Sequence, residues 1–402
     1  MKLKEQRSEF ASFWNFDPET VFLNHGSFGA CPTEVNSYRA GLLDQLENQP
    51  VDFIQREYMP RIPGILEKLE NFTGAAPGSI VLVTNVTTGI NTVLSNLSIN
   101  PGDELVTTGQ EYFSSANILR TNAAKYDAKY VEVPIDSPVS GPDQVIDSIM
   151  SEITSRTVLV LIDHISSPTG MVFPVKELVL RLDQLGIDVL VDGAHGPGMV
   201  PLNLEELGAA YYTGNCHKWM CAPKTSALLY VRPDKQKNFR PAVMSHVASE
   251  FDIEMSDFQI EFFWNGTIDP TPRMSIPFTI DFMESLHPGG WTGIISENHE
   301  KAVRAERFIC ERLGIEPYCP KSMIGSMAAV SLPWKPPSER LPPDGIDLLQ
   351  NWLLREKQIE IPVTYTSIPC GRFLRLSAQL YNSDAEFEYL CESLMEAPIS
   401  LL

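Results

Sequence analysis

Residues 157–192 read TVLVLIDHISSPTGMVFPVKELVLRLDQLGIDVLVD, and this stretch decides the fold class. A strand is expected at 157–163, and its apolar run at 158–162 indicates a strand covered on both faces, as strands of a parallel sheet are. The amphipathic segment at 175–185 predicts a helix, and a second apolar strand follows at 189–192. A strand, a crossover helix and a further strand form a βαβ unit, which is the building block of a parallel α/β sheet.

The same alternation continues on both sides of this unit. Short β-branched runs predict further strands at 80–83, 105–107, 130–133, 211–213 and 227–231. Helices are expected between them at 88–97, 114–126 and 143–153. We therefore predict an α/β fold with a mostly parallel central sheet, in a large domain over residues 21–284.

The pattern changes after about residue 270. Long helical segments are expected at 276–286 and 297–313, and short strands at 328–332 and 373–377, with a proline-rich loop at 333–343. We expect a smaller α+β domain over residues 285–402. Residues 1–20 are expected to pack as an arm or helix on one of the domains.

Composition excludes several classes of protein. The 402 residues include 31 Lys and Arg against 51 Asp and Glu, so the net charge is −20 and no nucleic acid partner is expected. No run approaches the roughly 18 apolar residues of a membrane span, and the charged start lacks the apolar segment of a signal peptide. The seven scattered cysteines show no paired CxxC spacing, which favours a reducing compartment, and we expect a cytoplasmic protein.

Ligands of an open α/β sheet bind beyond the carboxyl ends of its strands, and three such ends carry polar motifs. The first motif, NVTTGIN at 85–91, places Thr87 and Thr88 where a strand passes into a helix. The free N–H groups and the positive dipole of a helix start suit a phosphate. Taken alone, the motif is explained more simply by one threonine acting as the helix N-cap.

The other two motifs follow the strands at 189–192 and 211–213. In VLVDGAHGPG, Asp192 ends the strand and His195 comes three residues later. Asp192 could anchor a ligand, bind a metal or cap a helix, and we expect no metal because the few histidines form no zinc-type spacing. In TGNCHKW, Lys218 lies in a polar turn, where a lysine is usually a solvated charge.

Together these motifs match the needs of one cofactor. Pyridoxal phosphate requires a phosphate grip, a partner for its pyridine nitrogen and an amine that forms a Schiff base. The motifs NVTTGIN, HISSPTG, DGAH, TGNCHKW and RLSAQLYN occur in this order, after FLNHGSFGACP at 22–32. They resemble the class V aminotransferase family of fold-type I pyridoxal phosphate enzymes, in its isopenicillin N epimerase-like branch. The resemblance spans about residues 20–390 and implies pyridoxal 5'-phosphate as the cofactor.

The resemblance also implies roles for individual residues. Lys218 would carry the cofactor as a Schiff base and abstract the substrate α-proton, Asp192 would pair with the pyridine nitrogen, and His195 would contact the ring. Arg375 would bind the substrate α-carboxylate through its two-pronged guanidinium, although a buried ion pair is its structural alternative. The phosphate contacts would come from Thr87, Thr88, Asn215 and His217, and the substrate pocket would include Asn24 and His25.

The resemblance further implies a second subunit, and the sequence differs from the family pattern at one position. WNGTIDPTP at 264–272 resembles the family segment that reaches the neighbouring subunit's phosphate, which implies a homodimer in which Thr267 completes the partner site. Many relatives have a histidine or aromatic residue that stacks on the ring where this chain has Gln110. Tyr112 and Phe113 are the alternatives for that contact.

Removal of the α-proton can lead to several reactions. The branch resemblance favours amino-acid epimerisation, with a C–S lyase acting on cysteine or a cysteine conjugate, or an aminotransferase, as alternatives. Epimerisation needs an acid or base on the second face, for which His25, Tyr112 and Tyr365 are candidates. A persulfide-forming desulfurase is not expected, because residues 360–364 hold no nucleophilic cysteine and the nearest thiol is Cys370.

Overall fold

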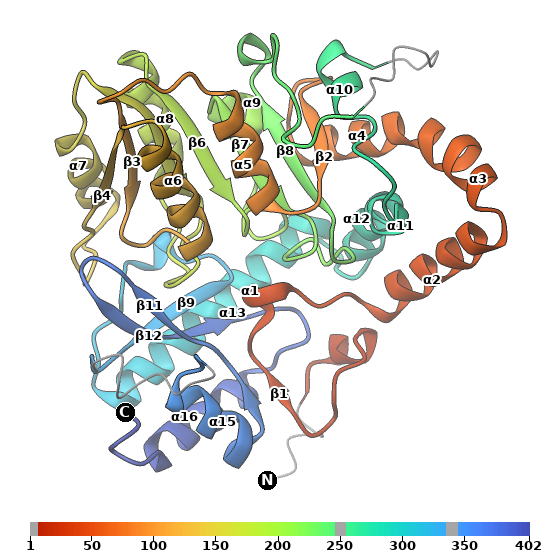
Figure 1. Cartoon of the computed structure of the whole chain (residues 1–402). Coiled ribbons are helices and arrows are strands. Elements are labelled where there is room, and N and C mark those ends of the chain that lie inside the picture. Colours follow the sequence, from red (N-terminus) through yellow and green to blue (C-terminus); the bar gives the residue numbers. More distant parts are fainter. Residues whose placement is uncertain (1–6, 246–254, 335–344) are drawn as a thin grey trace.

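The centre of the fold is a seven-stranded sheet (Figure 1). The computed structural model describes residues 7–245, 255–334 and 345–402. The strand order is β2-β8-β7-β6-β5-β3-β4, and neighbours are parallel except that β8 runs antiparallel to both β2 and β7. The strands are β2 (Ile80–Val83), β3 (Glu104–Thr108), β4 (Lys129–Val133), β5 (Thr157–Asp163), β6 (Asp188–Gly193), β7 (Tyr211–Asn215) and β8 (Ala227–Val231). The mostly parallel sheet is confirmed.

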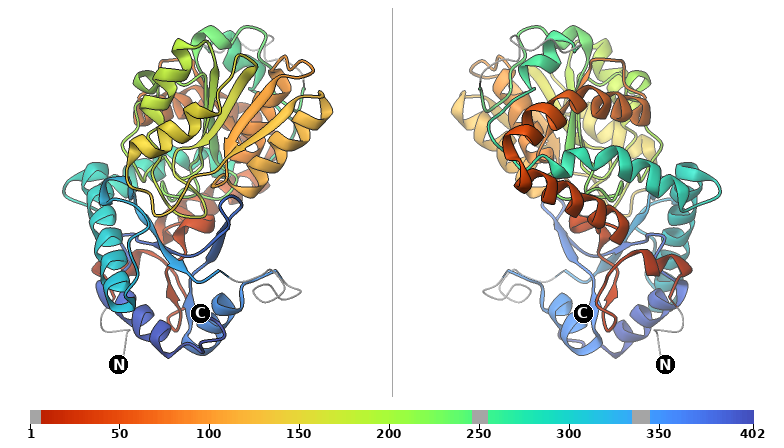
Figure 2. Two further views of the ribbon diagram at one scale, coloured as in Figure 1. Left: turned by 90° about the vertical axis from the view of Figure 1, so that its left-hand side faces the viewer. Right: turned by 90° about the vertical axis from the view of Figure 1, so that its right-hand side faces the viewer.

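Successive side chains of the central strands enter two different apolar cores. Leu159 and Leu161 join one core, and Val160 and Ile162 join the other. Because side chains alternate across a strand, a strand with helices on both faces must be apolar throughout. Figure 2 shows these helices on both sides of the sheet. They are α5 (Val86–Asn96), α6 (Phe113–Lys125), α7 (Pro142–Ser151), α8 (Val175–Gln184) and the short α9 (Leu204–Leu207).

Helices from both ends of the large α/β region cover the side of the molecule on which β2 lies. The first group is α2 (Thr33–Asn48), α3 (Pro50–Asp52), a π-helical turn (Phe53–Tyr58) and α4 (Met59–Thr73), whereas the short α1 (His25–Phe28) lies between the central sheet and the small sheet (Figure 1). The second is α10 (Asp257–Glu261), α11 (Thr271–Met274) and α12 (Ile276–Ser285). Helices α2 and α4 contact α11 and α12, and this layer faces the viewer on the right of Figure 2.

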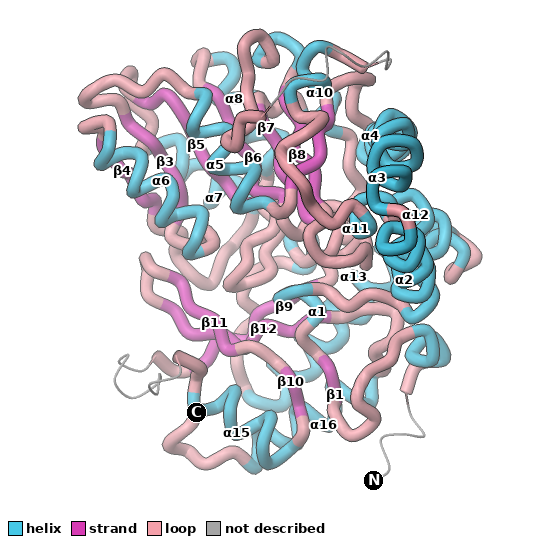
Figure 3. Tube along the Cα trace, turned by 45° about the vertical axis from the view of Figure 1, so that its right-hand side comes forward, coloured by secondary structure: helices cyan, strands magenta, loops and turns pink. Residues whose placement is uncertain are grey.

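The carboxyl-terminal part is built on a small antiparallel sheet in the order β11-β12-β9 (Figure 3). Its strands are β9 (Met327–Leu332), β11 (Val363–Thr366) and β12 (Gly371–Ser377), so the strands expected at 328–332 and 373–377 are confirmed. Its helices are α13 (Gly290–Leu313), α15 (Leu348–Lys357) and α16 (Asp384–Glu396). The short strand β1 (Val21–Phe22) pairs with β10 (Ile359–Glu360), which ties the start of the chain to this part.

The predicted start of one long helix was wrong. Helix α13 begins at Gly290, seven residues before the expected position, with Gly289 as its N-cap. Trp291 packs edge-on against Phe72 and donates from Nε1 to the carbonyl of Ile280, and Ile294 is fully buried. Burial of these side chains outweighs the low helix propensity of the glycines.

The remaining segments are short. A 3₁₀ turn at Glu9–Phe13 leads to Trp14, whose ring packs on Tyr381, and further 3₁₀ turns lie at Pro233–Lys235 and Lys321–Met323. Most of the proline-rich loop expected at 333–343 lies outside the described residues. Within the described residues, no helix combines the length and the apolar character needed to cross a membrane.

Candidate active site

The predicted lysine and aspartate lie at the same edge of the sheet, where parallel strands end. Asp192 is next to last in β6 and is paired in register with Thr213 of β7 and Asp163 of β5. Its buried carboxylate accepts hydrogen bonds from the backbone N–H of Ala194 at 3.0 Å and the hydroxyl of Ser115 at 2.8 Å. Lys218 lies in the turn that follows β7. Strand ends thus bring together residues 26 positions apart in the sequence.

His195 contacts the amine of Lys218. The Nε2 atom of His195 lies 3.1 Å from Nζ of Lys218, and its Nδ1 atom accepts a 3.2 Å hydrogen bond from the indole N–H of Trp219. An indole N–H can only donate, so the proton of a neutral His195 must lie on Nε2. Nε2–H then donates to Nζ, which can accept only through the lone pair of a neutral amine. The arrangement therefore favours Lys218 as an uncharged base.

Electrostatics favour the same state. Burial, and secondarily the positive charge of Arg375, lower the pKa of Lys218 to about 8, against the opposing effect of Asp192 and Asp163. Burial holds the pKa of His195 well below its usual value, so its ring is neutral near pH 7. A lysine with a pKa near 8 has a substantial neutral fraction at physiological pH. Such an amine is a nucleophile for an aldehyde and a base for a carbon acid.

The start of α5 faces the end of β7. Asn85 caps the helix by accepting from the N–H and hydroxyl of Thr88, and the N–H of Val86 donates to the side-chain oxygen of Asn215 at 3.1 Å. Thr87 is exposed in the first turn. A threonine N-cap, the simpler interpretation of this motif, was therefore wrong, because the capping residue is Asn85. A helix start with an exposed hydroxyl remains suited to a phosphate.

His217 and Thr267 take different positions. The Nδ1 atom of His217 lies 3.0 Å from the carbonyl oxygen of Ser226, and this contact orients the half-buried ring within the turn that carries Lys218. Thr267 is exposed on the loop between α10 and α11. In the described part of the chain, no hydrogen bond joins Thr267 to the other predicted site residues.

Arg375 of β12 extends from the small sheet toward this edge. Its guanidinium is buried and donates to neutral oxygens, at 2.6 Å to the carbonyl of Ser167 and 2.9 Å to the hydroxyl of Ser27, with a longer 3.4 Å contact to Asn24. Its Nε has no hydrogen-bond partner among the residues that the structure describes. Burial lowers the pKa of Arg375 to about 10, which leaves it charged at neutral pH. A buried cation bonded only to neutral groups favours an anionic ligand.

The two residues predicted to line the substrate pocket, Asn24 and His25, lie in different surroundings. Asn24 lies beside Arg375 and also donates to Glu360 at 3.0 Å. His25 is fully buried, with its ring nitrogens 2.9 Å from the hydroxyl of Tyr381 and 3.1 Å from the carbonyl oxygen of Lys218. Burial lowers the pKa of His25 to about 3. His25 therefore supports the backbone of the lysine turn.

The segment that carries the candidate stacking residues follows β3. Gln110 is buried, and its amide donates to Tyr318 at 2.5 Å and accepts from Thr169 at 2.9 Å. Tyr112 and Phe113 are exposed, and Tyr112 is close enough to Arg375 to affect its pKa. The amide of Gln110 is thus held by other side chains, whereas Tyr112 is exposed and acts electrostatically on the guanidinium of Arg375.

Two buried acids beside Asp192 were not predicted. The carboxylates of Glu111, Asp163 and Asp192 offer oxygen atoms that all lie within 4.8 Å of one another. Asp163 ends the apolar run of β5 and Glu111 lies three residues beyond β3. An acid at the end of each of these neighbouring strands is a feature of the sequence from which the carboxylate group could have been predicted. The expectation of no metal considered only histidine and cysteine spacing and missed this carboxylate group.

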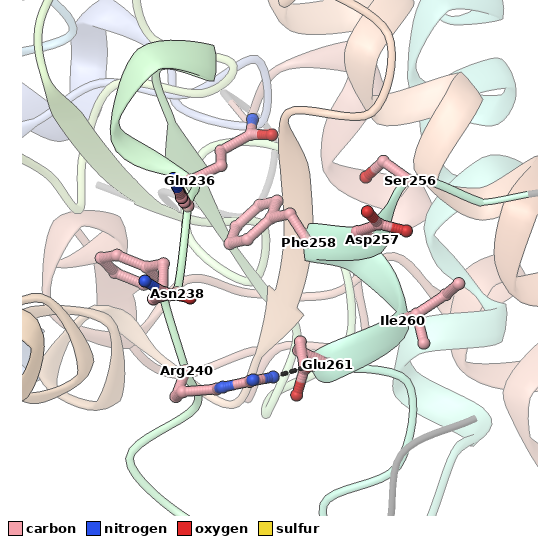
Figure 4. Close-up of a pocket in the computed structure, with 10 residues that line it drawn as sticks. Gln236, Asn238, Arg240, Ser256, Asp257, Phe258, Ile260 and Glu261 are labelled. Carbon is pink, nitrogen blue, oxygen red and sulfur yellow. Dashed lines mark ion pairs between the residues drawn. The ribbon is translucent and has the colours of Figure 1, made fainter. Parts of the chain in front are cut away.

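A separate cavity lies at the opposite edge of the sheet. Because β8 is antiparallel, its end at Val231 points away from Asp192 and Lys218. Beyond it, residues 236–240 and α10 enclose a pocket of 680 Å³, in which Phe258 lies between the two walls and Arg240 pairs with Glu261 (Figure 4). This pocket contains none of the predicted site residues.

Comparison with known proteins identifies the family. The sequence model of aminotransferase class V matches residues 54–304. The chain belongs to the class V aminotransferase family. This class V enzyme is 30% identical to the probable chloroplastic L-cysteine desulfhydrase of Arabidopsis thaliana, over 97% of its own length and 85% of the relative. It is also 30% identical to isopenicillin N epimerase of Amycolatopsis lactamdurans, over 95% and 96% of the two chains.

Solved structures give the fold of the class V enzyme. The cysteine desulfurase of Thermococcus onnurineus NA1 matches with a TM-score of 0.75 and 19% identity over 94% of both chains. The cystine C–S lyase C-DES matches with a TM-score of 0.75 and 19% identity, over 93% of this chain and 97% of the other. A structure of C-DES contains the pyridoxal phosphate cofactor. The fold is therefore fold-type I, and the cofactor of this class V enzyme is pyridoxal phosphate.

The side chains at the strand ends fit this cofactor. The neutral amine of Lys218 suits its aldehyde, the carboxylate of Asp192 suits a protonated ring nitrogen, and the helix start at Thr87 suits its phosphate. Arg375 leaves an unpartnered Nε for an anionic substrate group. All four groups belong to loops or strand ends at one edge of the central sheet or to the strand β12 that approaches it.

Proposed function

We propose that this class V enzyme is a C–S lyase that acts on cysteine or a cysteine conjugate. The observation that carries the proposal is that Lys218 is an uncharged base, whereas two candidates for a second base, His25 and Tyr365, are held by other side chains. The net reaction with cysteine and water releases pyruvate, ammonia and hydrogen sulfide. The desulfhydrase relatives support this substrate class.

Each step assigned to the protein uses a described contact. Arg375 binds the α-carboxylate and sets the α-hydrogen near Nζ of Lys218, which removes the proton. The imidazole of His195, held by Trp219, keeps that amine neutral before it acts. Asp192 pairs with the ring nitrogen. Bound pyridoxal phosphate supplies a ring that accepts the electron pair left at the α-carbon.

The phosphate of the cofactor is assigned to the start of α5 and the lysine turn. Its contacts are proposed to come from Thr87, Thr88, Asn215 and His217, with Thr267 from a second subunit. The link from Asn215 to the N–H of Val86 holds these two segments together. The exposed position of Thr267 on the loop between α10 and α11 supports a homodimer in which it reaches the partner.

The number of available bases favours lysis over epimerisation. Lysis needs one base at the α-carbon, whereas inversion needs proton delivery to the opposite face. Of the three candidates for that second role, His25 is buried against Tyr381 and the hydroxyl of Tyr365 donates to Asp347. Because both side chains already contact other residues, neither His25 nor Tyr365 is well suited to deliver a proton to the substrate.

Epimerisation is the second candidate function because Tyr112 is exposed and close enough to act electrostatically on Arg375. In this second proposal, its phenol would deliver a proton to the face opposite Lys218. The relationship to isopenicillin N epimerase supports this reaction equally well by identity. Transamination would use the same lysine and would release a keto acid with the carbon skeleton of the substrate.

Product analysis distinguishes these reactions. Holoenzyme is incubated in deuterated water with L-cysteine, cysteine conjugates and other L-amino acids, while pyruvate, sulfide, keto acids and chirality are measured. Pyruvate with equimolar sulfide or thiol supports the lyase. Inversion with deuterium at the α-carbon and no pyruvate would replace the lyase with the epimerase. A Lys218→Ala variant is the matched control and should be inactive in every assay.

The compartment is also a proposal. All seven cysteines are free thiols, and five of them are buried. Unpaired thiols persist in reducing compartments, which supports the cytoplasm as the location.

A further inference from the structure

The three carboxyl groups of Glu111, Asp163 and Asp192 form one buried group, here called the acid cluster. Their side chains are nearly inaccessible, and oxygen atoms of all three lie within 4.8 Å of one another. Asp163 and Asp192 are register partners on β5 and β6. Glu111 reaches them from the turn after β3, which is closed by its own N–H donating to the carbonyl of Thr108 at 3.1 Å. Three negative charges cannot coexist in such a volume without cations among them.

The hydrogen bonds decide which member of the acid cluster carries charge. Asp192 accepts short bonds from Ser115 and the N–H of Ala194. In the described part of the chain, Glu111 accepts only from its neighbouring N–H at Tyr112, at 3.1 Å, and weakly from Thr107, at 3.4 Å. Asp163 has an oxygen, Oδ2, without a hydrogen-bond partner among the same residues. A carboxylate is stabilised by donors, so Asp192 is the best site for a negative charge.

The pKa values agree with this assignment. Burial, and secondarily the negative charges of the neighbouring acids in the cluster, hold the pKa values of Glu111 and Asp163 well above their usual range, which favours the protonated form of both. Burial raises the pKa of Asp192 as well, but the N–H of Ala194, the hydroxyl of Ser115, the charge of Lys218 and Glu111 all act to lower it. Lys218 is the cation that acts on both Asp163 and Asp192.

We propose that Glu111 is a positioning residue that stays protonated, donates its carboxyl hydrogen to Asp192, and thereby leaves Asp192 as the single anion of the acid cluster. The inference rests on the proposed function, in which Asp192 pairs with the cofactor nitrogen. A neutral donor behind Asp192 fixes the carboxylate without adding a competing charge. Asp163, equally neutral, fills the third corner of the cluster.

The test compares two replacements of Glu111 in the holoenzyme. Glu111→Gln keeps a hydrogen-bond donor without a titrating proton, whereas Glu111→Met keeps the volume and removes the donor. We expect Glu111→Met to weaken pyridoxal phosphate binding about tenfold and to shift the pH midpoint of the cofactor absorbance, and Glu111→Gln to restore both to within about threefold of the parent. Glu104→Met is the matched control, because Glu104 is a buried glutamate at the other end of β3.

Infrared spectroscopy detects the protonated carboxyl group directly. The parent holoenzyme should show the C=O stretch of a protonated carboxyl group at neutral pH, and part of that band should disappear in Glu111→Gln and not in Glu104→Met. The inference is overturned if Glu111→Gln leaves the band unchanged, if Glu111→Met binds the cofactor as the parent does, or if both Glu111 variants are equally weak. A stoichiometric divalent metal in the holoenzyme would also overturn it.

A separate variant distinguishes failure of this inference from failure of the proposed function. Asp192→Asn should reduce cofactor affinity and alter the absorbance band. If it does so while Glu111→Met has no effect, only the inference about Glu111 is wrong. If Asp192→Asn behaves as the parent does, the proposed role of Asp192 is wrong, and with it the basis of the inference.

Discussion

Arg372 and Arg375 lie three residues apart on β12, and both guanidinium groups are buried, but only Arg372 has a carboxylate partner. Arg372 pairs with Asp347 at 2.8 Å and also donates to the carbonyls of Leu401 and Leu402. Arg375 is bonded to neutral oxygens and keeps an unpartnered Nε. A buried ion pair was the structural alternative for Arg375, but on this strand it is Arg372 that forms such a pair. The guanidinium of Arg375 has no carboxylate partner in the described part of the chain and suits an anionic ligand.

This contrast predicts opposite phenotypes for the two arginines. Arg375→Met should raise KM for α-amino acids by at least about 100-fold with the cofactor spectrum unchanged, because it removes a charge-assisted contact of about 3 kcal/mol. Steady-state kinetics and absorbance measure both quantities. Arg372→Met should instead destabilise the fold by about 3–5 kcal/mol, because Asp347 is left as an unpaired buried charge. Equal KM values for the parent and Arg375→Met would remove Arg375 from the site.

The pKa of Lys218 predicts how cofactor uptake depends on pH. Only the neutral amine attacks the aldehyde, so the rate of incorporation into apoprotein should rise about tenfold per pH unit and level off above a midpoint near 8. Absorbance after mixing apoprotein with pyridoxal phosphate at pH 6 to about 9 measures this rate. A pH-independent rate over that range would contradict a titrating Lys218.

Replacement of Trp219 should shift this midpoint upward. Trp219→Phe removes the indole N–H that holds the proton of His195 on Nε2. His195 could then accept a hydrogen bond from a protonated Lys218, which stabilises the ammonium and raises its pKa by up to about one unit. The same mixing experiment measures the shift. A midpoint at or below that of the parent would show that Trp219 does not act through His195.

A buried glutamate of α13 predicts a pH-dependent stability. Burial raises the pKa of Glu306 to about 7 from 4.5, so the folded chain holds this proton more tightly than the unfolded chain does. The stabilisation that this tightly held proton gives the folded state is fully present below pH 4.5 and is lost as the pH rises through about 7. Between pH 5 and about 8, the free energy of unfolding should therefore fall by about 2–3 kcal/mol less in Glu306→Gln than in the parent. Urea unfolding at several pH values measures this difference, and parallel curves would contradict it.

The local sequence predicted the elements of the sheet with little error. The strands at 80–83, 157–163 and 227–231 end where expected, because an apolar run between polar or glycine-bearing turns reports burial on both faces directly. The order of strand-end motifs likewise identified the family that the comparisons confirm. The predicted helix start at 297 was wrong because packing of Trp291 against Phe72, a partner distant in sequence, decides where α13 begins.

The motifs also named the residues at the strand ends, because a lysine or acid directly after an apolar run is visible in the sequence. Only the tertiary structure decided which partners these residues have. It turned His25 into a buried support of the lysine turn, fixed the proton of His195 through Trp219, and placed Glu111 against Asp192. Hydrogen bonds, desolvation and charge interactions depend on distances between segments far apart in the chain, and local sequence does not encode those distances.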